Sequence, residues 1–110
     1  MPAELPDGIV IEPVFLVEVT YAPDAAETRP RHRAEHLARV AALRAAGTII
    51  EAGGCSDFSA AYLIVRASDA AAVEALVQED VYTRNGVWRE VRVRGFGRVC
   101  RAEEVPGQPG

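Results

Sequence analysis

The sequence predicts an α+β fold in which one antiparallel sheet carries two helices on one face. Three observations favour this fold class. Four segments are rich in β-branched and aromatic residues, two segments repeat apolar residues at helical spacing, and the order is strand, helix, strand, strand, helix, strand. Hydrophobic residues make up 49% of the 110 residues, which is enough to fill the core of one domain.

The first half of the chain predicts one strand and one long helix. Residues 14–21, VFLVEVTY, predict a strand that needs cover on both faces, because odd and even positions are both mostly apolar. Residues 22–29 predict a loop. Residues 31–46 predict a helix whose apolar stripe contains His36, and Gly47 follows as the residue that ends it.

The second half of the chain predicts a two-stranded hairpin, then a second helix and a last strand. Residues 48–52 and 58–66 predict the two strands of the hairpin, since glycines separate two β-rich runs. Ser68 and Asp69 offer an N-cap pair before the alanine- and valine-rich run at 70–78, which predicts the second helix. After an irregular segment, alternating valines predict the last strand at 87–96. This order is that of a ferredoxin-like βαββαβ fold.

The predicted domain spans residues 13–100. Residues 1–12 contain prolines and predict a flexible N-terminal arm, and residues 101–110 predict a flexible C-terminal tail. The first and third strands carry apolar residues on both faces, so the sheet face away from the helices also needs cover. We therefore expect a homodimer that forms through this open sheet face.

Composition and charge exclude several functions. All 12 basic residues are arginines, which excludes lysine Schiff-base chemistry and a phosphate-binding loop with its lysine. A formal net charge of −4 argues against nucleic acid as a partner, and no apolar run is long enough to cross a membrane. The N-terminal residues lack a secretory pattern, so we expect a cytoplasmic protein with Cys55 and Cys100 as free thiols. His32 and His36 lie one turn apart without a zinc-binding motif around them, so we expect no metal and no other cofactor.

His36 is the main candidate for chemistry. It lies in the apolar stripe of the first helix and should point at the sheet, where a neutral imidazole can accept or donate a proton. The alternative is a core histidine with one satisfied hydrogen bond. Arg33, one turn earlier, either reaches the same pocket and binds a carboxylate or lies in solvent. Arg39 and Arg44, on the flanks of the helix, are expected to be solvated.

Asp80 is the second candidate, because it follows the second helix. A carboxylate at that position is unfavourable beside the helix dipole, so a compensating partner is expected. A hydrogen bond from a ring nitrogen of His36 to the Asp80 carboxylate would orient the imidazole, whereas the alternative is a loop aspartate in water. Tyr82 and Trp88 belong either to the core or to the lining of a pocket for a ring-shaped ligand.

Five short segments between residues 33 and 96 together form a recognisable pattern. They are RAEHL at 33–37, AGG at 52–54, Asp80-Val81-Tyr82, Gly86-Val87-Trp88, and a Val-x-Val strand that is followed by Phe96. Their joint order and spacing resemble the YciI-like (YCII-related) family of the dimeric α/β-barrel superfamily. The resemblance implies His36 as the acid and base, Asp80 as its orienter, and Arg33 as an anion binder. We expect substrate contacts from Arg33, Gly53, Tyr82 and Trp88.

The resemblance also implies a function. We expect a small cofactor-independent enzyme whose His–Asp pair performs a lyase, isomerase or dehalogenase-like step on a small cyclic or carboxylated substrate. One alternative is a cofactor-free monooxygenase or cyclase that acts on an aromatic or polyketide-like ring. Another is a non-catalytic ligand-binding dimerisation module, in which His36 and Asp80 lie too far apart to bond.

Overall fold

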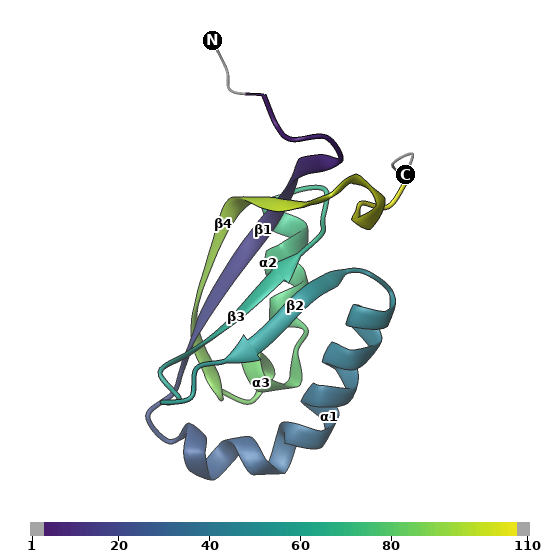
Figure 1. The fold of residues 1–110 in the computed structure, drawn as a ribbon. Coiled ribbons are helices and arrows are strands. Elements are labelled where there is room, and N and C mark those ends of the chain that lie inside the picture. Colours follow the sequence, from purple (N-terminus) through teal and green to yellow (C-terminus); the bar gives the residue numbers. More distant parts are fainter. Residues whose placement is uncertain (1–3, 108–110) are drawn as a thin grey trace.

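The computed structural model describes residues 4–107 as one sheet with helices on one face (Figure 1). The elements are β1 (Ile9–Tyr21), α1 (Ala25–Ala45), β2 (Ile49–Gly54), β3 (Ala60–Val65), α2 (Ala70–Gln78), α3 (Val81–Arg84), β4 (Trp88–Arg101) and a short 3₁₀ helix (Ala102–Glu104). The strands are antiparallel and lie in the order β2-β3-β1-β4. The predicted α+β, ferredoxin-like βαββαβ fold is confirmed, with α3 as an additional short helix.

The core lies between the sheet and the helices. Alternate positions of β1 and β3 point at the helices, as the period of two in a strand requires. Val17 and Val65 are fully buried there, and they pack with Val73 and Val77 of α2 in one cluster that also includes side chains of α1 and α3. Each fully buried valine stabilises the fold by roughly 1.5–3 kcal/mol relative to an exposed one.

Helix α1 begins at Ala25 and not at residue 31, so most of the loop predicted at 22–29 is helical. Pro30 therefore lies inside the helix. Proline lacks the N–H for an intrahelical bond and its ring crowds the preceding turn, so it bends a helix. Figure 1 shows the first turns of α1 running in a different direction from the rest of the helix. Within residues 4–107, no helix is both long enough and apolar enough to cross a membrane.

Strands β1 and β4 are longer than the sequence predicts. They pair from Ile9 with Arg101 to Tyr21 with Trp88, so residues 9–12 of the expected N-terminal arm belong to the sheet, and β4 continues five residues past Phe96. The two strands satisfy each other's backbone groups along this length, which apolar alternation alone does not reveal. Residues 1–3 and 108–110 lie outside the described residues.

A buried carboxylate, that of Glu12, holds the long β1–β4 pair in place. Glu12 is 7% exposed, and it accepts hydrogen bonds from Arg66 Nε at 2.7 Å and from an Arg98 guanidinium nitrogen at 2.9 Å. Arg66 also donates to the carbonyl oxygen of Gly47 at 3.1 Å. The hydrogen bond from Arg66, above all, holds the pKa of Glu12 below its usual value despite burial. The cluster ties β1 and β4 to the ends of β3 and α1.

Much of the sheet face away from the helices is open in the single chain, although Glu12 and Val14 on this face are buried. The register places Leu16 beside Ile64 and Arg94 on that face, and Val14 beside Phe96, which is 39% exposed. Apolar and charged side chains are thus mixed on this outer face. It is the face that the sequence predicts to be covered by a second copy of the chain.

Candidate active site

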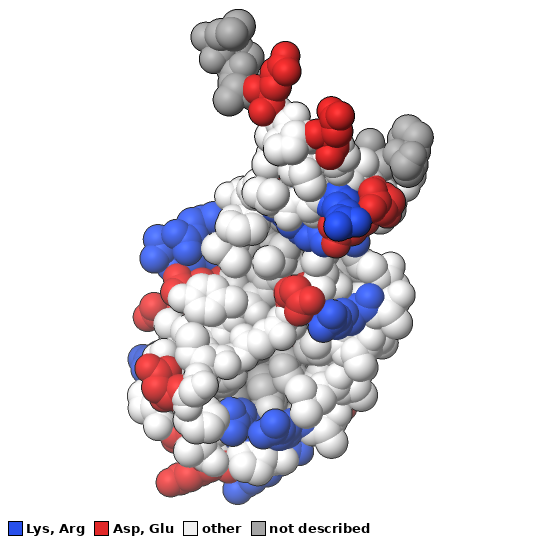
Figure 2. All heavy atoms as spheres, in the orientation of Figure 1, with Lys and Arg blue, Asp and Glu red and all other residues white. Residues whose placement is uncertain are grey.

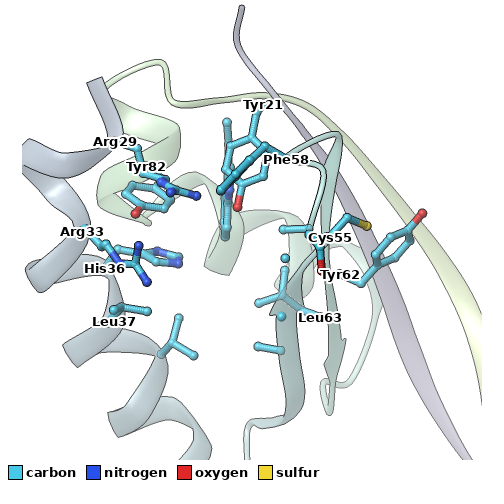
Figure 3. Close-up of a pocket in the computed structure, with 17 residues that line it drawn as sticks. Tyr21, Arg29, Arg33, His36, Leu37, Cys55, Phe58, Tyr62, Leu63 and Tyr82 are labelled. Atoms are coloured by element: carbon cyan, nitrogen blue, oxygen red, sulfur yellow. The ribbon is translucent and has the colours of Figure 1, made fainter. Parts of the chain in front are cut away.

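A cavity of about 370 Å³ opens between α1, the β2–β3 hairpin and the segment that leads from α3 into β4. Its size suits a small organic molecule. Figure 3 shows side chains of α1 on one side of the cavity and those of the hairpin on the other. All the substrate-contact candidates and His36 line the cavity, whereas Asp80 lies behind His36. The lining candidates are Arg33, His36, Gly53, Tyr82 and Trp88.

His36 and Asp80 are in direct contact. The Nδ1 atom of His36 lies 2.8 Å from Oδ1 of Asp80, which is an ordinary hydrogen-bond length. His36 lies in the middle of α1, and Asp80 is the residue that precedes α3. Two elements that are far apart in the sequence therefore form the pair. Both side chains are buried, with 8% and 2% exposure respectively. The structure therefore brings together the two residues predicted as catalytic.

Asp80 caps the short helix α3 and is fully satisfied. Its Oδ1 also accepts from the backbone N–H of Tyr82 at 2.9 Å, and its Oδ2 accepts from a guanidinium nitrogen of Arg39 at 3.0 Å. Burial raises the pKa of this carboxyl, but the hydrogen bonds from His36 and Tyr82 and the charges of His36 and Arg39 outweigh it and hold the pKa below its usual value. Asp80 is thus ionised at neutral pH.

An ionised Asp80 decides which nitrogen of His36 carries the proton. A carboxylate only accepts hydrogen bonds, so Nδ1 must be the donor. In the neutral imidazole the opposite nitrogen, Nε2, is then the basic atom. Nε2 has no hydrogen-bond partner within residues 4–107, and Nδ1 is the ring nitrogen that forms a hydrogen bond there. The arrangement therefore leaves one basic nitrogen free on a side chain that lines the cavity.

Arg39 is a site residue that the sequence did not single out. It was expected in solvent, but its side chain is only 25% exposed. One guanidinium nitrogen donates to Asp80, and another donates to the carbonyl oxygen of Leu76, near the end of α2, at 2.8 Å. The spacing of three residues from His36 was the available signal, because it places both side chains on neighbouring parts of one helix face. Arg44, in contrast, is exposed and pairs with Glu51 at the surface.

Aromatic rings enclose the imidazole. The Tyr82 ring stacks on His36 with centroids 3.8 Å apart and planes inclined by 11°. Trp88 meets His36 edge-on, at 5.0 Å and 82°. Such contacts fix the ring orientation and keep water from its faces. Trp88 and Tyr82 are 5% and 2% exposed, so they are part of the core and of the cavity wall at once.

The cavity lining also includes residues that the sequence did not indicate, among them Tyr21, Arg29 and Phe58. Arg29 was expected in a loop, and it reaches the cavity because α1 begins earlier than predicted. Phe58 was predicted at the start of a strand, yet it lies in the hairpin turn with φ of 60° and 60% exposure.

Both cysteines are free thiols, and Cys55 is the one that lines the cavity. His32 does not line it, and no three potential metal ligands meet within the described part of the chain.

The fold and the site define a class: small ferredoxin-like α+β proteins with a buried His–Asp pair behind an aromatic cavity. The family model of the YCII-related domain matches residues 14–97, so the chain belongs to the YCII-related, or YciI-like, family.

Among solved structures, the chain is similar to the 5-chloro-2-hydroxyhydroquinone dehydrochlorinase TftG of Burkholderia phenoliruptrix AC1100, in complex with 2,5-dihydroxybenzoquinone. The TM-score is 0.63 and the sequence identity 26%, over 74% of this chain and 90% of that chain. No curated protein sequence matches the chain. The resemblance to the YciI-like family is thereby confirmed, and the similar structure belongs to an enzyme that acts on a small ring compound.

Proposed function

We propose that the protein is a small enzyme in which His36 transfers a proton during the elimination of a small acid, such as HCl, from a planar ring substrate. The observation that carries the proposal is the 2.8 Å contact of His36 Nδ1 with Asp80, which leaves Nε2 free on the cavity side. The similarity to a dehydrochlorinase supports elimination as the reaction, and that enzyme's quinone ligand supports a planar ring as the substrate.

The proposed elimination requires no oxidant. Nε2 takes a proton from the substrate, the released electron pair forms a new double bond, and the leaving group departs with its bonding pair. The ring thus loses H–X, and the proton on His36 passes to solvent. Asp80 stabilises the imidazolium that forms, because its carboxylate lies at hydrogen-bond distance from the other ring nitrogen. The two aromatic neighbours of His36 keep water away and offer flat surfaces to a ring.

Chloride release tests the proposal. Chlorinated hydroxyhydroquinones are incubated with the purified protein, and chloride is measured together with the absorbance of the quinone product. We expect release well above the rate without protein, with no consumption of oxygen. Oxygen uptake with an electron-rich ring substrate would instead favour the cofactor-free monooxygenase, and ligand binding without turnover would favour the non-catalytic module.

Arg39 is proposed as a positioning residue that acts through Asp80. We expect Arg39→Gln to lower kcat about tenfold with little change in KM, because a charge-assisted hydrogen bond to the carboxylate is lost. Arg39→Lys should restore part of the rate, since it returns the positive charge. The acidic limb of the pH–rate profile of Arg39→Gln should move to higher pH, because the pKa of Asp80 rises when this cation is removed.

The surface arginine Arg44 provides the matched control for Arg39. It lies on the same helix and also pairs with a carboxylate, that of Glu51, but both side chains of this pair are exposed. Arg44→Gln should leave both kcat and the pH profile unchanged. A wild-type pH profile in Arg39→Gln would contradict the positioning role.

We also propose that the protein forms a homodimer through the outer face of the sheet. Leu16 and Ile64 lie side by side on this face and form part of a shallow apolar hollow with Gly53 and Tyr62. Exposed apolar side chains that gather on a sheet face in this way are normally covered. Size-exclusion chromatography with light scattering should give twice the chain mass of 11.8 kDa, and a monomer at micromolar concentration would contradict the proposal.

A further inference from the structure

The cavity has a positive rim in a protein that is negative overall. The formal net charge of the chain is −4, yet the cavity lining includes Arg29 and Arg33 and, among residues 4–107, no aspartate or glutamate. Figure 2 shows basic side chains beside the hollow, and Figure 3 shows Arg29 and Arg33 on the α1 side, next to Tyr82 and His36. A local cluster of one charge in a cleft attracts ligands of the opposite charge.

These two arginines also differ from most others in the chain. Eight arginines, including Arg39 and Arg66, lie within 4.0 Å of a carboxylate, whereas Arg29 and Arg33 form no ion pair with residues in the described range 4–107. Their charges act inside the cavity, because both oppose the rise in the pKa of Tyr82 that burial causes. Two uncompensated guanidinium groups one helical turn apart are donors without a protein acceptor.

Aromatic rings hold Arg29 in place. Its guanidinium carbon lies 4.5 Å from the centroid of the Phe58 ring and 6.0 Å from that of Tyr21. These cation–π contacts position the group without neutralising its charge. Phe58 has a positive φ of 60°, a conformation that is costly for a bulky residue and that tends to occur at functional sites. Arg29 is thus ordered by apolar partners and keeps its N–H groups for a ligand.

A buried donor lies deeper in the same cavity wall. The indole nitrogen Nε1 of Trp88 has no hydrogen-bond partner within the described residues, although the residue is 95% buried, being 5% exposed. An unmade hydrogen bond of this kind costs about 1–3 kcal/mol, so such groups are rare without a ligand or a water. This nitrogen has almost no accessible surface, whereas the two arginines offer donors to oxygen atoms of a ligand, and the remaining lining of the cavity is mostly apolar.

We propose that the cavity selects a planar ring that carries an anionic oxygen, either a carboxylate or a ring oxyanion, and that Arg29 and Arg33 bind this oxygen at the mouth. The inference rests on the proposed function and names the substrate class of the same site. A guanidinium pair binds an anionic oxygen through charge-assisted hydrogen bonds, while the aromatic wall accepts the ring. Bound in this way, the ring lies against the wall that contains His36, which is three residues from Arg33 on α1.

Equilibrium binding tests this inference without any turnover. Trp88 is the single tryptophan of the chain, so an isotope-labelled sample gives one indole N–H resonance, which comes from the cavity wall. The probes are benzoate, its neutral analogue benzamide, and pentafluorophenolate as a ring oxyanion. We expect a saturable shift of the indole resonance with at least one of the anions, and about tenfold weaker binding of benzamide than of benzoate if the carboxylate is the preferred anion. Saturation by the phenolate alone identifies the ring oxyanion as the preferred form.

Variants connect the binding to the two arginines. Arg29→Gln and Arg33→Gln should each weaken anion binding about tenfold, equivalent to about 1.4 kcal/mol. Arg31→Gln is the matched control, because Arg31 is exposed on the same helix and does not line the cavity. It should bind the anions as the wild type does.

Three results would overturn the inference: no saturable shift with either anion, equal affinity for benzamide and for the preferred anion, or wild-type anion affinity in both cavity variants. His36→Gln should keep its anion affinity within about twofold, since Gln removes the base and not the rim. Wild-type activity in His36→Gln would therefore refute the proposed proton transfer without affecting the proposal of the anion site. A loss of the preference for anions over benzamide would refute the anion site without affecting the proton transfer.

Discussion

Replacing His36 by glutamine should lower kcat by about 10²–10⁴-fold, the usual contribution of a positioned acid or base. Glutamine has the length to hydrogen-bond Asp80 but has no basic nitrogen to take a proton. The fold should persist, because the amide can still donate to the carboxylate that Nδ1 now contacts at 2.8 Å. The measurement is the rate of chloride release from the most reactive chlorinated hydroxyhydroquinone, with the indole resonance of Trp88 as a check that the cavity is intact.

The other histidine supplies the control for this experiment. His32 lies one turn earlier on α1, is partly buried, and does not line the cavity. His32→Gln should keep kcat within about twofold, as substitutions away from a site usually do. Chloride release by His36→Gln at the wild-type rate would refute proton transfer by this side chain, whatever the substrate.

Asp80→Asn should be the most destabilising polar substitution, at about 3 kcal/mol of unfolding free energy. Three donors converge on the two carboxylate oxygens, from His36, Arg39 and the backbone of Tyr82. An asparagine amide offers one oxygen and turns its NH₂ group toward a donor, so at least one buried partner loses its bond. Urea unfolding, followed by tryptophan fluorescence, measures the difference.

The loss should depend on pH in a defined direction. The pKa of Asp80 is lower in the folded protein than in the unfolded chain. Its contribution is therefore complete above the unfolded pKa of about 3.9 and is lost as the pH falls through the folded value. The wild type and Asp80→Asn should differ by a constant amount at neutral pH, and the two curves should approach each other below about pH 4.

Asp69→Asn is the matched control for this substitution. Asp69 also caps a short helix, with its carboxylate accepting from the backbone N–H of Ala72 at 2.8 Å, but it is exposed and outside the His36 cluster. Asparagine is as good a cap as aspartate, so the change should stay within about 0.5 kcal/mol. Equal effects of the two substitutions would mean that Asp80 stabilises the protein only as a helix cap.

The sequence predicted the fold because its strong signals are periodic. Alternation along 58–66 and the apolar stripe around His36 each follow from one repeated geometric rule. Element ends were less predictable. The helix was predicted to begin at residue 31, although a helix can continue through a proline with a bend, as α1 does at Pro30. The pairing of residues 9–12 with β4 depends on the distant partners of Glu12. Such partners lie far apart in the chain, so no local pattern shows them.

The site was partly predictable for a similar reason. His36 and Asp80 stood out because a polar residue in an apolar stripe and a carboxylate after a helix both need partners. Arg39 and Arg29 did not, because arginine is frequent in this chain and is usually solvated. Only the packed structure shows that Arg39 bonds a buried carboxylate and that Arg29 lies over Phe58.

The bend at Pro30 has a consequence for how this protein can change. Arg29 precedes the proline, whereas His36 and Arg39 follow it on the part of α1 that is anchored to Asp80. The first two turns of the helix can therefore vary in sequence or in angle without moving the acid–base pair. The contribution of Arg29 to ligand preference is thus carried by a separate stretch of the helix, while Arg33 lies on the stretch that carries His36. A library confined to residues 26–29, which leaves the buried Ala25 in place, should retune selectivity while preserving the catalytic geometry.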